Sequence, residues 1–319
     1  MNPRTRPKPD PLPSRSRRRS SGISRQSAAL RSLRRRSPYP ESSRFRARSA
    51  RTAEILNDFR PEATLRADLE DMYEFRARYG RAPGCELHEA SDLAWFATGV
   101  DDELFNGILR FEATDSEADA KVRSVMEQFR LRHLPYHWMV TPAMRPSDLA
   151  GRLKALGFRH LFPILGMALL LATMEKTPVP DGFTIRRVLD RPMLGQWVRI
   201  MVTSFEATQR AVPGAVDLEE RLGLDWTLPG RRYLGFLDGE PVATSLGFFH
   251  GGVAGVHYVT TLPEARGRGI GTTMTAAPLE EARAMGYRIG VLQASPAGAS
   301  VYRKMGFRTH AEYPLFVSP

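Results

Sequence analysis

The sequence predicts an α/β fold built on a mixed sheet, and three observations support this prediction. Strand-like apolar runs alternate with helical segments between Phe183 and Pro319. A glycine-rich loop follows one of these strands and precedes a helix. A strand, loop and helix pattern also occurs twice, once in each half of the chain. Such alternation indicates helices packed on the faces of a sheet.

The elements of the second half follow in a clear order. Trp197, Ile200 and Met201 recur at helical spacing, and Asp238-Gly239 joins two apolar runs as a strong hairpin signal. A charged, proline-containing linker at Glu175 to Asp181 precedes them. We expect a strand over 183–188 and a helix over 192–207. Two hairpin strands should follow over 232–237 and 241–249, and a further strand over 252–261.

The repeated pattern occupies Trp138 to His160 and Ile289 to His310. In the first copy we expect a helix from about Asp148 to Leu156, with Ser147 as its N-cap and Gly157 ending it in a left-handed conformation. Self-similarity of this kind suggests two related units in tandem. The alternative is that a helix followed by Gly-Phe is only a common cap.

The formal charge of +11 is concentrated at one end of the chain. Residues 1–51 carry a net charge of +14, whereas residues 52–319 are nearly neutral. This Arg-, Ser- and Pro-rich tail has few large apolar side chains, so we expect it to be disordered. It also resembles an organelle transit peptide without the apolar face, or a translated upstream stretch without a function.

Cysteine and histidine usage argues against a metal site or a disulfide. The one cysteine, Cys85, excludes an intramolecular disulfide and fits a reducing, cytoplasmic location. His133 and His137 have the spacing of two ligands on a helix face, but Pro135 between them disfavours that helix. The longest apolar run, Leu161 to Ala172, is shorter than the ~20 residues of a membrane span and is typical of a buried strand.

The glycine-rich loop, Leu262 to Gly271, has the composition of an anion site. Glycines allow close approach, the first amides of the following helix lack partners, and two arginines add positive charge. A diphosphate is the natural ligand. The loop lacks the Gly-Lys-Ser/Thr ending of a P-loop and lies too late in the chain for a first Rossmann unit.

This loop resembles motif A of the GNAT acetyltransferases, which Arg266, Gly269 and Gly271 match. The resemblance implies a GNAT fold with a mixed, mostly antiparallel sheet, loop amides on the pyrophosphate of acetyl-CoA, and a preceding strand on the pantetheine. Pro278, inside the next helix, departs from the pattern and should kink or break it. The cofactor-binding residues implied are Val259, Thr260, Thr261, Arg266, Gly267, Arg268, Gly269, Ile270, Gly271, Thr272 and Ser295.

A second family landmark is Tyr302, which precedes Gly306-Phe307. Ser295 stands where the family commonly has Asn, seven residues earlier, and can still donate and accept a hydrogen bond. The resemblance implies that Tyr302 is the general acid that protonates the departing CoA thiolate. The general base is not evident; His257 and Glu206 are candidates, and a chain of water molecules is the alternative.

The first half resembles a degenerate copy of the same unit. Leu153 stands where the acid should be, and the segment 111–130, where a phosphate loop belongs, contains no glycine. We therefore expect a non-catalytic GNAT-like domain at 53–174, which supports the acceptor site, and a catalytic domain at 183–319.

The function implied is direct acetyl transfer from acetyl-CoA to a primary amine of a small molecule or peptide, without a metal. Two other functions stay open: a non-catalytic acyl-CoA-binding regulator, and a nucleic-acid-associated protein acting through its basic tail. The folded part has no basic excess, so contact with nucleic acid is expected only non-specifically through the tail. No partnership with a membrane is expected. The sequence leaves the acceptor and the oligomeric state undefined.

Overall fold

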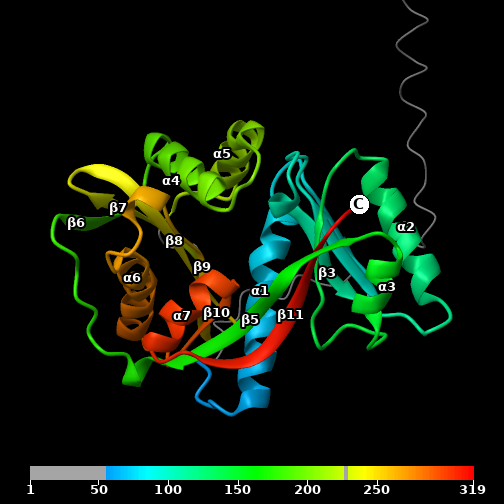
Figure 1. Cartoon of the computed structure of the whole chain (residues 1–319), viewed down its shortest axis with the longest axis horizontal. Helices are drawn as coiled ribbons and strands as arrows, with labels where there is room; N and C mark the ends of the chain where they lie inside the picture. Colours follow the sequence, from blue (N-terminus) through cyan, green and yellow to red (C-terminus); the bar gives the residue numbers. More distant parts are fainter. Residues whose placement is uncertain (1–54, 226–228) are drawn as a thin grey trace, which may run out of the picture. The chain divides into compact units, whose positions relative to one another are not determined.

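One continuous sheet of eleven strands runs through the part of the chain that the computed structural model describes, residues 55–225 and 229–319 (Figure 1). The strand order is β1-β2-β3-β4-β11-β5-β10-β9-β8-β7-β6. Within the described ranges only the pairs β3–β4 and β9–β10 are parallel. The predicted α/β class with a mixed, mostly antiparallel sheet is confirmed. The tail prediction for residues 1–51 lies outside the described residues.

The strands are β1 (Glu86–Glu89), β2 (Leu93–Ala97), β3 (Asn106–Phe111), β4 (His137–Met139), β5 (Arg159–Leu170), β6 (Phe183–Arg187), β7 (Gly230–Leu237), β8 (Glu240–His250), β9 (Val253–Thr261), β10 (Ile289–Ala294) and β11 (Arg308–Val317). The α-helices are α1 (Pro61–Arg81), α2 (Ala118–Arg130), α3 (Leu149–Ala155), α4 (Arg191–Ser204), α5 (Val212–Arg221), α6 (Ile270–Ala284) and α7 (Pro296–Lys304). Short 3₁₀ turns are η1 (Glu103–Phe105), η2 (Leu171–Thr173), η3 (Gln209–Ala211) and η4 (Pro263–Ala265).

The two halves of the chain, here the N-terminal half (residues 55–174) and the C-terminal half (residues 183–319), exchange their last long strands. β5, from the N-terminal half, pairs with β10 of the C-terminal half. β11, from the C-terminal half, pairs with β4 of the N-terminal half. β5 and β11 also pair with each other at the centre of the sheet. The exchange makes one sheet out of two sets of strands.

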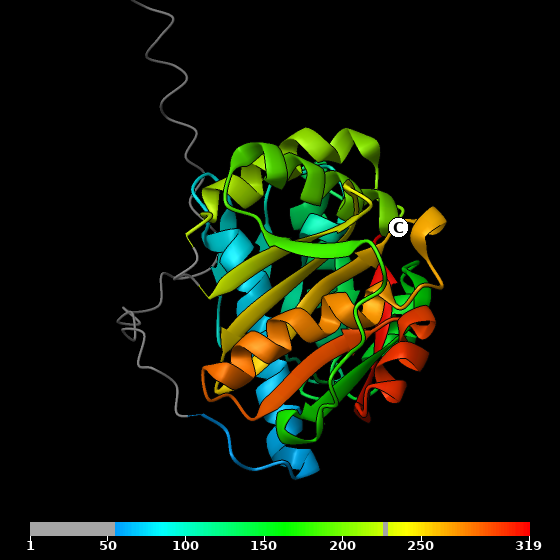
Figure 2. The same cartoon turned by 90° about the vertical axis from the view of Figure 1, so that its left-hand side faces the viewer.

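Successive side chains of a strand point to opposite faces of the sheet, and each face packs against its own helices. On β10, Val291 packs with Ala67 of α1, whereas Leu292 packs with Leu279 of α6. α4 and α5 share a core cluster with α1 and cover the same face. In Figure 2, α6 lies in front of the strands of the C-terminal half and α1 lies behind them. The helix α1 is therefore buried against strands of both halves.

The succession β1-β2-β3-α2-β4-α3-β5 in the N-terminal half has the same order as β7-β8-β9-α6-β10-α7-β11 in the C-terminal half. This likeness supports tandem units at 53–174 and 183–319, and that division stays a prediction. Two local predictions are confirmed, since Asp238 and Gly239 both have positive φ in the hairpin turn and Gly157 ends α3 with φ 92°.

Two other local predictions are wrong. Ser147 is not the N-cap of α3, because the helix begins one residue later, after Asp148, without a side-chain cap. The predicted break at Pro278 is wrong, because α6 continues through it to Ala284, whereas the kink stays a prediction. The proline ring lies against Gly247 of β8, where a Cβ would come within 2.8 Å of it, so the ring is part of the helix–sheet contact.

Candidate active site

The parallel strands β9 and β10 separate at the level of His257 and Gln293. They pair from Ala254/Gly290 to Val256/Leu292, and β9 then continues to Thr261 without a partner on β10. Two parallel strands that part in this way leave backbone groups on their facing edges free for another extended chain. The predicted site residues Val259, Thr260 and Thr261 lie on this part of β9.

A β-bulge in β9 causes the separation. Tyr258 has φ 49°, and between Thr244/Thr260 and Leu246/His257 the residues Tyr258 and Val259 lie opposite Ser245 alone. A bulge bends its strand and increases the local twist. The Thr244 hydroxyl donates to the Tyr258 carbonyl at 2.8 Å, and the Trp197 indole N–H donates to the Ser245 carbonyl at 3.2 Å. These bonds satisfy carbonyls that the disturbed ladder would otherwise leave unpaired.

A buried polar network fixes the side chain of the bulged residue. The Tyr258 hydroxyl lies 2.9 Å from that of Tyr79 on α1, which donates to Glu219 on α5 at 2.5 Å. Arg232 on β7 forms a salt bridge with Glu219, and both side chains are almost fully buried. The side chain of Tyr258 is thus held by a network that includes α1, α5 and β7.

The loop after β9 has the geometry of an anion cradle. Gly267 and Gly269 adopt φ of 78° and 80°, a left-handed conformation that side chains rarely adopt, and a Cβ on Gly267 would meet nothing within 4 Å. Gly269 is the N-cap residue of α6, and the amides that follow begin the helix without intrahelical acceptors. Gly267 and Gly269, which precede these amides, are exposed.

Two arginines flank the cradle. Arg266 donates from Nε to the Thr261 carbonyl at 3.0 Å, which fixes the loop to the end of β9. Arg268 is exposed. Within the described ranges neither guanidinium forms a salt bridge, so both positive charges add to the helix dipole at this point. The predicted residues from Arg266 to Thr272 therefore form one continuous cationic turn.

Tyr302 lies on α7, half-buried behind the start of α6. Its ring packs on Phe307 with centroids 5.9 Å apart. Burial raises the pKa of Tyr302 to about 12, opposed by a hydrogen bond with Thr275. Thr275 is fully buried and donates to the Gly271 carbonyl at 2.8 Å, so it links the phenol to the first turn of α6. The phenol is protonated at neutral pH.

Ser295 directly follows β10 and caps α7. Its hydroxyl oxygen accepts from the Gly298 amide at 3.3 Å, as an N-cap residue does. The cap sets the start of the helix that carries Tyr302, whose ring lies against Gly298. Ser295 thus has a local structural task, and its predicted contact with the cofactor stays a prediction.

The two base candidates have different surroundings. His257 is 7% exposed, stacks on Phe75 with centroids 3.7 Å apart, and contacts Asp71 from Nε2 at 3.0 Å. Burial, with smaller contributions from Arg76 and Arg78, holds the pKa of His257 well below its usual range. The imidazole is therefore neutral and faces α1.

Glu206 is exposed and directly follows Phe205, whose ring lies 5.8 Å from that of Tyr258. It has φ 57°, an uncommon conformation for a residue with a side chain. The carboxylate is open to water near the bulge, whereas His257 is enclosed beneath it. The assignment of a general base to either residue stays a prediction.

Sequence reasoning missed two buried carboxylates on α1. Asp68 contacts Gln293 at 2.7 Å, His310 at 3.0 Å and Tyr313 at 2.7 Å, and so joins α1 to β10 and β11. Asp71 occupies the space beside Gly255, where a Cβ would collide with it. Burial and the neighbouring Asp68 raise the pKa of Asp71 well above its usual range. The available signal was two acidic residues three apart in the segment that forms α1, a spacing that places both on one face of a helix.

The corresponding region of the N-terminal half differs in charge. β3 and β4 also separate after two paired positions, Gly107/His137 and Ile108/Trp138. Glu112 and Asp115 of the loop that follows β3, together with Asp92 from the turn between β1 and β2, line a surface hollow with carboxylates. Such a surface repels a diphosphate. The counterpart of Tyr302, Leu153, is fully buried in the core.

Within the described ranges no group of His, Cys, Asp and Glu side chains is arranged to hold a metal ion. The described helices also include none with the length and apolar character needed to cross a bilayer.

Residues 198–307 match the model of the acetyltransferase (GNAT) family. A mycothiol acetyltransferase of Streptomyces griseus subsp. griseus is 27% identical over 48% of this chain and 55% of its own length. Another, of Pseudarthrobacter chlorophenolicus, is 25% identical over 68% of this chain and 71% of its own length. The chain thus spans about half the length of the first of these relatives and more of the second.

Two solved structures share the fold. A GCN5-related N-acetyltransferase from Kribbella flavida superposes with a TM-score of 0.59 at 19% identity, over 79% of this chain and 95% of that one. A tandem GNAT protein from the clavulanic acid biosynthesis pathway superposes with a TM-score of 0.51 at 13% identity, over 83% of this chain and 97% of that one. At these identities the likeness establishes the fold alone, and it extends over both halves.

Proposed function

We propose that the protein is an N-acetyltransferase that uses acetyl-CoA to acetylate a primary amine by direct transfer, as the match of residues 198–307 to the GNAT acetyltransferase family supports. The observation that carries the proposal is the glycine cradle at the start of α6, beside the opening between β9 and β10. A diphosphate at the cradle directs the pantetheine chain along the unpaired edge of β9. The thioester then lies between the bulge and Tyr302.

In the proposed reaction the amine nitrogen attacks the thioester carbonyl carbon. A carbon–nitrogen bond forms, the carbon–sulfur bond breaks, and the amine gives up a proton. Donors at the unpaired edge of β9, near Val259, stabilise the charge that develops on the carbonyl oxygen. Tyr302 gives its proton to the departing thiolate, for which a phenol that stays protonated is suited.

We propose that the amine proton leaves through Glu206, or through water beside it, because this carboxylate is open to solvent near the bulge. His257 is the alternative base. It is neutral and could accept a proton, but it is enclosed by Phe75 and Asp71, so an acceptor reaches it only if α1 moves. Replacing each residue by its neutral isostere separates the two assignments.

The N-terminal half, proposed as a non-catalytic domain at 53–174, supports the acceptor side through α1. This helix packs behind β9 and presents Tyr79 to the bulge. The names of the two curated relatives make a mycothiol-related amine the first acceptor to test. A cytoplasmic location fits the lone cysteine, Cys85.

The experiment is CoA release by the purified full chain, measured with a thiol reagent against a panel of amines that includes mycothiol-related, polyamine, amino-acid and peptide acceptors. We expect acetyl-CoA to bind and one class of amines to accelerate CoA release above hydrolysis. Binding without acceleration by any amine would favour the acyl-CoA-binding regulator. Failure of acetyl-CoA to bind would overturn the proposal.

A further inference from the structure

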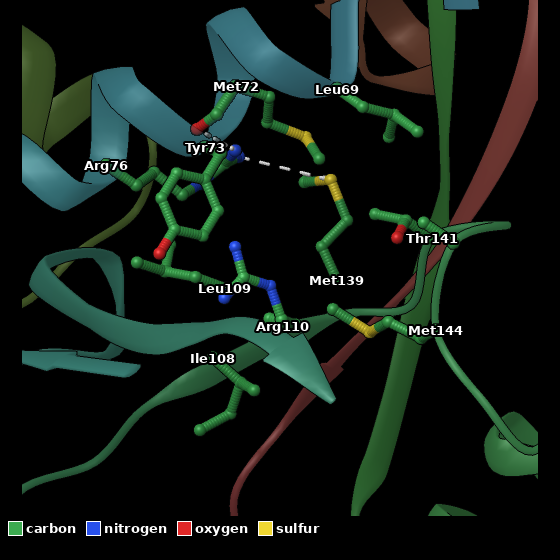
Figure 3. Close-up of a pocket in the computed structure, with 11 residues that line it drawn as sticks. Leu69, Met72, Tyr73, Arg76, Ile108, Leu109, Arg110, Met139, Thr141 and Met144 are labelled. Carbon is green, nitrogen blue, oxygen red and sulfur yellow. Dashed lines mark hydrogen bonds between the residues drawn. The ribbon is translucent and has the colours of Figure 1, made fainter. Parts of the chain in front are cut away.

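A cavity of about 130 Å³ lies in the N-terminal half, away from the glycine cradle and the candidate acid (Figure 3). Its walls come from α1, from the end of β3, and from β4 with the loop that follows it. Met72, Met139, Met144 and Ile108 supply apolar surface, and Arg76 and Arg110 supply two positive charges. The cavity is not part of the site described above.

The separation of β3 and β4 opens this cavity. The two strands pair only at Gly107/His137 and Ile108/Trp138, after which Arg110 on β3 and Met139 on β4 lie on opposite sides of the gap. The same separation in the C-terminal half leads to the cradle. Here the helix α1 covers the gap on one face of the sheet and contributes Arg76 to the enclosed space.

Arg76 forms no salt bridge, unlike Arg232 and Arg78, although the buried carboxylates Asp68 and Asp71 act on its charge from beyond salt-bridge distance. Arg232 and Arg78 both pair with Glu219, whereas Arg76 contacts the Met72 carbonyl at 3.4 Å and the Met139 sulfur at 3.9 Å. Within the described ranges no carboxylate lies within 4 Å of its guanidinium. A partly buried guanidinium with two weak acceptors retains unused donors.

Arg110 is the second unpaired cation at the cavity. It donates to the Ala90 carbonyl at 2.9 Å and lies over the Tyr73 ring at 5.1 Å from its centroid, and in the described part of the chain it forms no salt bridge. Figure 3 shows Arg76 and Arg110 around the same space. An anion in the cavity would be attracted by both guanidinium groups.

We propose that this cavity binds a small carboxylate with an apolar body about the size of a benzene ring. The carboxylate pairs with Arg76 in the field of Arg110, and planar guanidinium groups favour two-point binding of carboxylates. The apolar body lies against the methionines and Ile108, where flexible thioethers adapt to its shape. The size follows from volume, because an apolar protein cavity of ~150 Å³ accommodates benzene.

The cavity lies within electrostatic reach of the C-terminal half. Arg76 contributes to the lowered pKa of His257, after burial, so an anion paired with Arg76 would weaken that contribution. The ligand would thus alter the surroundings of one base candidate without contact with the acetyl-CoA cradle. Binding at the cavity does not depend on the proposed acetyl transfer.

Sodium benzoate is the probe, titrated into the full chain at constant ionic strength by calorimetry. We expect one site per chain with a Kd on the order of 0.1 mM. Benzyl alcohol, which lacks the charge, and acetate, which lacks the ring, should bind at least ~10-fold more weakly. Equal affinity for benzoate and benzyl alcohol, or no saturation up to about 10 mM benzoate, would overturn the proposal.

Arg76→Met should weaken benzoate at least ~10-fold by removing the paired charge. Arg66→Met is the matched control, because it removes the same charge from an exposed position of α1 and should leave the affinity unchanged. If Arg76→Met does not fold, Arg110→Met at the rim and the methyl signals of the methionines provide the test. Benzoate should shift the Met139 and Met144 methyl signals, and shifts confined to methionines elsewhere would contradict the assignment.

Discussion

The two pairs of parallel strands part in the same way, but the surfaces they open differ in charge. After β9 the chain turns through Gly267 and Gly269 into α6 with two arginines beside it. After β3 it turns through a glycine-free segment that carries Glu112 and Asp115. Both halves therefore show the same separation of parallel strands, and only the loop of the C-terminal half carries the glycines and arginines that we propose bind a diphosphate. The fold separates the two parallel strands, and the charge of the loop that follows determines which ligand can bind there.

The largest expected effect is on the cradle itself. Gly269→Glu should remove measurable acetyl-CoA binding, because the left-handed residue at the helix N-cap would gain both a Cβ and a repelling carboxylate. Calorimetry with acetyl-CoA measures it. Gly239→Glu is the matched control, since Gly239 has φ 91° with nothing near its Cβ and lies in the β7–β8 hairpin. Equal loss of binding in both variants would refute a specific role for the cradle.

Tyr302→Phe should leave acetyl-CoA binding within a few-fold and lower kcat by about 100- to 10,000-fold, the usual contribution of general acid catalysis. The change removes only the hydroxyl and keeps the packing on Phe307. The measurement is steady-state kinetics on an acceptor for which chemistry limits the rate. Tyr287→Phe, another partly buried tyrosine of the same half, should keep kcat. A normal kcat for Tyr302→Phe would show that the helix α7 serves packing alone.

The pH dependence of kcat should show no ionisation of the Tyr302 phenol between pH 7 and pH 9. The pKa of Tyr302 is raised to about 12, so the acid stays protonated throughout the neutral and mildly alkaline range. We expect no decrease of kcat between pH 7 and pH 9 from this group. A decrease in that range that disappears in Tyr302→Phe would contradict the pKa argument.

A smaller effect concerns the histidine beside the N-terminal opening. Burial lowers the pKa of His137 from 6.5 to about 4, while its Nδ1 contacts the Glu103 carbonyl at 2.8 Å. Below pH 6.5 the unfolded chain binds this proton and the folded chain does not, so stability falls as the pH falls toward 4. Between pH 7 and pH 5 the loss should be about 2 kcal/mol.

Urea unfolding at the two pH values measures this loss, and His137→Gln should reduce it. The same measurement is less direct for His257. As the pH falls, the lowered pKa of His257 decreases stability, whereas the raised pKa of the adjacent Asp71 increases it. An unchanged pH dependence in His137→Gln would mean that His137 titrates normally in the folded protein.

The smallest expected effect is in the acidic loop of the N-terminal half. Glu112→Gln should leave the acetyl-CoA affinity within about two-fold, because an exposed charge away from the binding site is screened. Calorimetry should also give one acetyl-CoA per chain. A stoichiometry of two would show that the N-terminal half binds acetyl-CoA despite its carboxylates.

Features with a local cause were predictable from the sequence. Asp238-Gly239 requires a tight turn, and Gly157 requires a helix end, because each depends on the φ of one or two residues. The cradle likewise follows from three glycines at alternate positions, Gly267, Gly269 and Gly271, after a strand. Pro278 was misjudged because the prediction considered its helix alone, whereas its ring packs against the sheet at Gly247.

Features that join distant segments were not predictable. The pairing of β5 with β10 depends on which edge each strand meets, and no residue in either strand specifies that partner. The bulge at Tyr258 is stabilised by Thr244, Trp197 and Tyr79, which lie far from it in the sequence or on other elements. Asp68 and Asp71 acquire their partners from the opposite end of the chain.

The exchange of β5 and β11 also has a consequence for the order of events during synthesis. β4 ends at Met139, but the strand that covers its edge begins only at Arg308. A nascent N-terminal half therefore leaves the ribosome with one sheet edge open, and β5 cannot pair with β10 until β10 has been synthesised. Open edges attract other strands, so this interval is when the chain is most exposed to pairing with a neighbouring copy or to capture by a chaperone. Closure of the sheet then couples the completion of one half to that of the other.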